Sequence, residues 1–239
     1  MRLDYIKDSV VKFTGIDPSR LDFCDDFHII VDKNVILLTN WRYDKRIMSL
    51  RSLAIEDNVL RQNCSYKSTR IAHKNDDMKR TLFAEIDTCQ WILGDKITSV
   101  YAQMETDKTL SLVMKTERGV LLSIEIALTL SEDTAPVTRH EIVGKEGMIC
   151  DRSINEQVPF EAVYLFENDK KSPLTYTDME AAFYGLLPDE ISVAENIIAS
   201  IPDYRNNFEE CDEQQIEKVI SAVYKSAELG ENVKVEDIG

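Results

Sequence analysis

Glycine and histidine are scarce in this chain of 239 residues, which contains eight glycines and three histidines. The sequence has no GxGxxG and no GxxxxGK[ST] segment, so the usual phosphate-binding loops of dinucleotide and nucleotide enzymes are not visible. The nearest segment, "VGKEGM" at 143–148, lies between two expected strands and is interpreted as a β-turn. A GxSxG nucleophile motif is also missing. The residues alone therefore indicate no catalytic site.

Other absences narrow the possible functions further. The five cysteines are scattered and form no CxxC pair, which predicts reduced thiols and no metal site. No apolar run is long enough to cross a membrane, and the first ten residues lack the apolar core of a signal peptide, so we expect a cytoplasmic protein. The net charge of −15 disfavours binding to nucleic acid or to an anionic membrane.

Hydrophobic spacing predicts the order of elements. The segment 27–41 alternates around "DKN" and indicates a hairpin. Helices are expected at 4–13, 43–57, 76–94, 191–201 and 211–231. Strands are expected at 59–68, 97–106, 109–117, 119–130, 136–144, 147–152, 158–167 and 232–235. So many consecutive strands with short loops require a mostly antiparallel sheet. We therefore predict an α+β fold with one large open sheet and helices packed on one face.

The helix expected at 76–94 carries the most notable group of charged residues. Glu85 and Asp87 lie close together on it, and Lys79 and Arg80 precede them. These four residues are candidates for a ligand cleft. The alternative interpretation is a solvated or ion-paired helix face, which the usual behaviour of surface charges favours.

Four segments, taken in order, resemble a known family. They are "AEIDTCQWILGDKITSVYA" at 84–102, "ERGVLLSIEIAL" at 117–128, "HEIVGKEGMICDR" at 140–152 and "VISAVYKSAELGENVKV" at 219–235. Together they resemble the C-terminal domain of the glucose–fructose oxidoreductase/inositol dehydrogenase (Gfo/Idh/MocA) superfamily. The resemblance implies an oxidoreductase C-terminal-like domain over 59–239, and over 1–58 a truncated remnant, of α/β type, of the family's nucleotide domain.

The resemblance also implies which positions should be catalytic. In the family, an Asp and a His on this helix act on the substrate hydroxyl, and the matching positions here hold Arg80 and Ala84. Alanine cannot transfer a proton, and arginine stays charged. Glu85, Asp87 and Trp91 fall on family positions. No cofactor is therefore expected, although NAD or NADP would be if the protein were an enzyme.

These observations favour a non-catalytic relative that acts in assembly or binds a sugar. The resemblance implies a homodimer or higher oligomer through the open sheet face, and we expect the strand "VLLSIEIALTL" to supply apolar side chains to it. In a sugar-binding protein, Arg80 would favour an anionic ligand. The alternative is a subunit of an NAD(P)-dependent sugar or polyol oxidoreductase that a full-length family member completes in trans.

Overall fold

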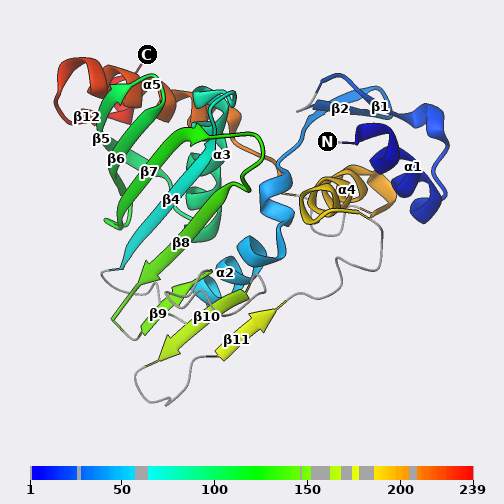
Figure 1. Ribbon diagram of the computed structural model, residues 1–239, viewed down its shortest axis with the longest axis horizontal. Coiled ribbons are helices and arrows are strands. Elements are labelled where there is room, and N and C mark those ends of the chain that lie inside the picture. Colours follow the sequence, from blue (N-terminus) through cyan, green and yellow to red (C-terminus); the bar gives the residue numbers. More distant parts are fainter. Residues whose placement is uncertain are drawn as a thin grey trace. The chain divides into compact units, whose positions relative to one another are not determined.

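The computed structural model describes most of the chain, namely residues 2–25, 28–56, 64–145, 147–151, 162–167, 174–177, 186–204 and 209–238. The chain forms two compact units (Figure 1). Unit 1 comprises Met1–Met48 and Asp178–Cys211, and unit 2 comprises Ser49–Thr177 and Asp212–Gly239. The domain boundary expected at residue 58 lies in 57–63, outside the described residues.

Unit 1 is built from two helices and a small sheet. Helix α1 (Leu3–Thr14) packs against α4 (Pro188–Ser200). Strands β1 (Leu21–Phe23), β2 (His28–Val31) and β3 (Asn34–Leu37) pair in that order, and both pairings are antiparallel. The short helices η1 (Pro18–Arg20), η2 (Asn40–Tyr43) and η4 (Pro202–Tyr204) complete the described part of the unit.

The expected hairpin is confirmed, since β2 and β3 flank a two-residue turn. Both turn residues, Asp32 and Lys33, have positive φ, as a tight hairpin turn requires. Buried apolar side chains from α1, the small sheet and α4 form one core cluster. Helix α4 therefore belongs to unit 1, whereas the sequence alone grouped it with residues 59–239.

Unit 2 is dominated by a nine-stranded sheet in the order β11-β10-β9-β8-β4-β7-β6-β5-β12. The pairing of β4 with β7 is parallel, and the other pairings are antiparallel. The fold is therefore α+β with a mostly antiparallel sheet, as predicted. The strands are β4 (Ser65–His73), β5 (Ile97–Thr106), β6 (Thr109–Thr116), β7 (Leu121–Leu130), β8 (Val137–Val143), β9 (Gly147–Cys150), β10 (Ala162–Glu167), β11 (Leu174–Thr177) and β12 (Val233–Lys234).

Helices α3 (Met78–Leu93) and α5 (Glu213–Leu229) pack against each other and against this sheet (Figure 1). Asp77 caps α3 by accepting a hydrogen bond from the Arg80 amide, and Asp212 caps α5 through the Gln215 amide. Helix α2 (Lys45–Glu56) begins after Asp44, whose carboxylate accepts from the Arg46 amide. A short helix η5 (Val235–Asp237) follows β12.

The alternation in β7 decides which face of the sheet is apolar. Leu122, Ile124, Ile126 and Leu128 are buried on the face that α3 covers, because Ile124 pairs with Ser68 and Ser68 contacts α3. The sequence assigned the apolar side chains of this strand to a face for self-association, which is wrong for these four residues. Leu121 is 55% exposed and lies on the opposite face. The opposite, open face mixes polar residues with exposed apolar ones.

Among the described residues, no helix combines the length and the apolar composition that a membrane crossing would need.

Candidate functional site

Helix α3 separates the four candidate residues. Arg80, Ala84, Asp87 and Trp91 follow the three- and four-residue spacing that puts side chains on one helix face. Glu85 lies about 160° from Asp87 around the helix axis, because successive residues are about 100° apart. The two acidic residues, two positions apart in the sequence, therefore point to opposite sides of α3.

The four candidates consequently do not converge on one cleft. Lys79 is exposed and forms an ion pair with Glu217 of α5, with 2.9 Å between Nζ and Oε2. Arg80 is also exposed, whereas Glu85 and Asp87 are both buried. Ala84, which the sequence resemblance matches to the family's catalytic histidine, is buried as well. Of the four, Glu85 has the most fully defined partners.

Glu85 is the centre of a buried polar cluster between α3 and the sheet. Its carboxylate accepts a hydrogen bond from Ser68 Oγ at 2.8 Å and one from the Arg70 guanidinium at 3.1 Å. Glu85 is 2% exposed and Ser68 is fully buried, while the Arg70 side chain is 31% exposed. A buried carboxylate needs such partners because desolvation otherwise disfavours its charged form. Arg70 thus links the buried charge to the surface.

His140 on β8 joins this cluster from the neighbouring strand. The Asp151 carboxylate accepts from the His140 backbone amide at 2.7 Å and lies 3.2 Å from its ring Nδ1. The other ring nitrogen, Nε2, lies 3.9 Å from Glu85 Oε2 and has no hydrogen-bond partner among the described residues. His140 therefore lies between two carboxylates in the interior of unit 2.

Tyr66 and Cys89 border the same cluster. Burial raises the pKa of Tyr66 well above its usual value, and the nearby Cys89, Glu85 and Asp151 raise it further. Burial also raises the pKa of Cys89 well above its usual value, with Glu85 and Asp87 adding to the effect. Both side chains therefore stay protonated, so neither supplies a phenolate or a thiolate nucleophile.

The sequence analysis missed most of this cluster. Tyr66, Ser68 and Arg70 occupy alternate positions along β4, so their side chains share the inward-facing side of the strand. Polar atoms therefore stand at positions where a strand usually has apolar side chains. This alternation of polar residues could have been recognised in the sequence. His140 and Asp151 meet across the β8–β9 pair, and their contact could not be read from spacing alone. In the part of the chain that the structure describes, Arg70 is 31% exposed and the other members of the cluster are at most 2% exposed. This geometry suits holding β4, β8 and α3 together better than touching a substrate.

The other face of α3 contacts helix α2. The guanidinium carbon of Arg51 lies 4.4 Å from the centre of the Trp91 ring, and Arg51 Nη1 donates a hydrogen bond to the Trp91 carbonyl. This cation–π contact anchors α2 on α3 within unit 2. Trp91 is therefore a packing anchor between the two helices.

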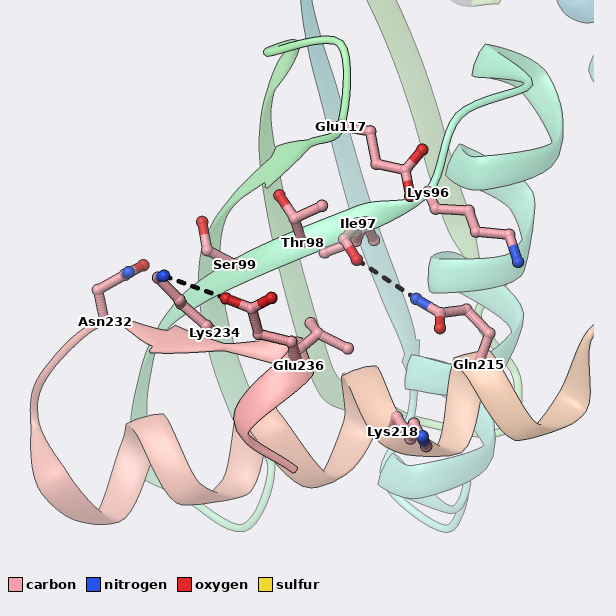
Figure 2. Close-up of a pocket in the computed structure, with 11 residues that line it drawn as sticks. Lys96, Ile97, Thr98, Ser99, Glu117, Gln215, Lys218, Asn232, Lys234 and Glu236 are labelled. Atoms are coloured by element: carbon pink, nitrogen blue, oxygen red, sulfur yellow. Dashed lines mark hydrogen bonds and ion pairs between the residues drawn. The ribbon is translucent and has the colours of Figure 1, made fainter. Parts of the chain in front are cut away.

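A surface pocket lies elsewhere in unit 2, between β5 and the start of α5 (Figure 2). We call it the β5–α5 pocket. Its volume is about 540 Å³. The lining residues are Lys96, Ile97, Thr98, Ser99, Glu117, Gln215, Lys218, Asn232, Lys234, Val235 and Glu236. None of the four candidates from the sequence lines it.

The described residues do not fit a dinucleotide bound in the Rossmann manner. Such a site needs a Gly-rich turn between a parallel strand and a helix. The glycines with positive φ end helices (Gly15, Gly94, Gly230) or turn a hairpin (Gly119). The sheet of unit 1 is antiparallel. In the described part of the chain, no group of His, Cys, Asp and Glu side chains is placed to hold a metal ion.

Comparison with known proteins assigns the fold. An oxidoreductase from Agrobacterium radiobacter, solved with NAD+, L-tartaric acid and magnesium, superposes with a TM-score of 0.64 at 13% identity, over 84% of this chain and 65% of that chain. A levoglucosan dehydrogenase solved with NADH and levoglucosan gives 0.64 at 16% identity, over 87% and 69%. This chain has the fold of these oxidoreductases.

The scyllo-inositol dehydrogenase from Lactobacillus casei has the same fold, with a TM-score of 0.58 at 14% identity over 83% of this chain and 62% of that chain. No protein-family model and no curated protein matches the sequence. The chain spans 62–69% of the length of these three proteins. The resemblance to the Gfo/Idh/MocA oxidoreductases is confirmed at the level of the fold.

Proposed function

We propose that this chain is a non-catalytic relative of sugar and polyol oxidoreductases, which transfers no hydride by itself and acts in assembly or ligand binding. One observation carries the proposal: the helix that matches the family's catalytic helix has Ala84 and Arg80 where a proton-transferring His and an Asp would stand. Ala84 offers only a methyl group, and it is buried. The antiparallel sheet of unit 1 supports the proposal, because it offers no phosphate-binding turn in the described residues.

The reaction itself tests this proposal. The purified chain is incubated with NAD or NADP and a panel of polyols and pyranosides, and absorbance by reduced nicotinamide is followed. We expect neither the wild-type chain nor Ala84→His to reduce NAD or NADP. In the proposal the chain lacks both the acid/base group and the cofactor site, and Ala84→His restores only the first. Turnover by the wild type would overturn it. Turnover by Ala84→His but not by the wild type would show that the cofactor site is intact. It would overturn the part of the proposal in which that site is missing.

Self-association through the open face of the sheet is part of the proposed assembly role. Val113 on β6 is 51% exposed and Leu121 on β7 is 55% exposed, and both lie on the face opposite α3. Lys115 and Glu125 on the same face carry opposite charges, which a two-fold axis could pair between copies. Light scattering after size exclusion should give the mass of a dimer or larger, and Val113→Lys should lower it. A monomer over the accessible concentration range would contradict this role.

A further inference from the structure

Two side-chain atoms of the buried polar cluster in unit 2 have their hydrogen-bonding capacity unused. His140 Nε2 and Tyr66 Oη are both buried, and neither has a hydrogen-bond partner among the described residues. His140 is 2% exposed and Tyr66 is 1% exposed. Buried polar atoms are nearly always paired with protein groups or ordered water, because an unpaired one loses its hydration without compensation. The two atoms therefore point to a further partner at this place.

Both atoms belong to the same part of the cluster. Ser68 of β4 is directly opposite His140 of β8 in the sheet register, and Tyr66 is two residues from Ser68, on the same side of the strand. The ring centres of Tyr66 and His140 lie 6.2 Å apart. Burial raises the pKa of the Tyr66 hydroxyl, and the charge of Glu85 on α3 adds to the effect. Polar groups from β4, β8 and α3 thus gather in one buried region.

The donors and acceptors define what this partner has to supply. An ionised carboxylate can only accept, so the 3.2 Å between Asp151 Oδ2 and His140 Nδ1 assigns a proton to Nδ1. In a neutral ring, Nε2 is then an acceptor. It lies 3.9 Å from Glu85 Oε2, which is a second acceptor. A charged ring would instead donate from Nε2 and approach this carboxylate to about 2.8 Å. The Tyr66 hydroxyl stays protonated and is the donor of the group.

We propose that one water molecule is bound in the interior of unit 2, between His140, Glu85 and Tyr66. The water donates one hydrogen bond to His140 Nε2 and one to Glu85 Oε2, and it accepts one from Tyr66 Oη. Two bonds of about 2.8 Å from one oxygen atom can span the 3.9 Å between the two acceptors. Three hydrogen bonds are also typical of a buried water.

The same donors and acceptors exclude other small ligands. An ammonium ion has no acceptor for the tyrosine proton, and a simple anion has no donor for the two acceptors. The water joins β8 to α3 through His140 and Glu85, whereas Ser68 and Arg70 join β4 to α3 directly. The site is therefore structural, and it does not depend on whether the chain transfers hydride.

The protonation of His140 is tested by NMR on the full chain, labelled with ¹⁵N in its histidine rings. The chain has three histidines, so His28→Gln and His73→Gln identify the His140 signals by elimination. At neutral pH we expect a neutral ring with its proton on Nδ1 and with Nε2 as a hydrogen-bonded acceptor. A doubly protonated ring would overturn the proposal, and so would a neutral ring with its proton on Nε2, because Nε2 would then be a donor.

A crystal structure of the full chain, at a resolution that shows ordered water, tests the ligand directly. We expect one water within about 3.2 Å of His140 Nε2, Glu85 Oε2 and Tyr66 Oη. In Tyr66→Phe the occupancy of this water should fall, because the water keeps only two of its three hydrogen bonds. A protein side chain in its place would overturn the proposal. So would the absence of any water within reach of Nε2, or an unchanged occupancy in Tyr66→Phe.

Tyr101→Phe is the matched control for Tyr66→Phe. Tyr101 lies between the buried residues Val100 and Ala102 on β5, so its side chain is on the opposite face of the sheet. The substitution removes the same hydroxyl group and should leave the water and the His140 signals unchanged. None of these measurements involves nicotinamide turnover, so failure here is distinguishable from failure of the proposed function.

Discussion

Replacing Ser68 by alanine should reveal how strongly unit 2 depends on its buried polar cluster. Ser68 is fully buried, and its hydroxyl donates to Glu85 at 2.8 Å. The substitution removes one oxygen atom and leaves almost no cavity, so the cost comes from the carboxylate that loses a donor. A hydrogen bond to a charged group contributes about 1.5–3 kcal/mol. Arg70 still partly compensates Glu85, so we expect unfolding free energy to fall by about 2 kcal/mol.

The assay can report on unit 2 alone, because the chain has two tryptophans and only Trp91 lies in that unit. In a Trp41→Phe background, urea unfolding followed by fluorescence reports the environment of Trp91. Urea is preferred to guanidinium because an ionic denaturant would screen the charges under test. The free energies of unfolding with and without Ser68→Ala are then compared at one pH.

Ser65→Ala is the matched control, since Ser65 is exposed on the opposite face of the same strand. It should change the free energy of unfolding by less than about 0.5 kcal/mol. In a Glu85→Gln background, the effect of Ser68→Ala should fall to about half, because a neutral amide is the weaker acceptor. If Ser68→Ala costs no more than Ser65→Ala, then Glu85 is not the buried, hydrogen-bonded charge that the account requires.

Two side-chain contacts and one backbone conformation can be tested in the same way. Arg2 lowers the pKa of Glu190 to about 2. The stability that this pair gives unit 1 is therefore present above the ordinary glutamate pKa of about 4.3 and is lost as pH falls through about 2. Thermal unfolding of Glu190→Gln should not show this loss of stability at low pH. Lys33→Gly should stabilise the hairpin by up to about 1 kcal/mol, because Lys33 has a φ of 70°, and urea unfolding measures it. Arg51→Ala should cost about 1–2 kcal/mol and shift the Trp91 emission to longer wavelength, since it removes the cation–π contact.

Periodicity predicted the fold of unit 2 well, because its strands have one buried face and one open face. The strands at 97–106, 109–117 and 119–130 match β5, β6 and β7 closely. The parallel pairing of β4 with β7 was not predicted, since it joins segments that are far apart in the sequence. Nor was the placement of α4 in unit 1, because its apolar face does not say which core it enters.

The site was less predictable than the fold. The sequence suggested Glu85 and Asp87 together as candidates for one ligand cleft. Helical geometry alone puts them on opposite sides of α3. The buried partner of Glu85 is on β4, seventeen residues earlier, and His140 approaches from β8. Contacts of this kind depend on strand order, which the sequence does not state. The pocket beside β5 is assembled from four separate segments, and it was missed for the same reason.

The central claim is that this chain keeps an oxidoreductase fold without a working dinucleotide site, and calorimetry tests it most directly. The purified chain is titrated with NAD, NADH, NADP and NADPH, and a full-length dehydrogenase of the same fold is the positive control. The account predicts no heat of binding from any of the four, while the control binds. A Kd in the micromolar range for any of them would contradict the account and would favour a subunit of a working oxidoreductase.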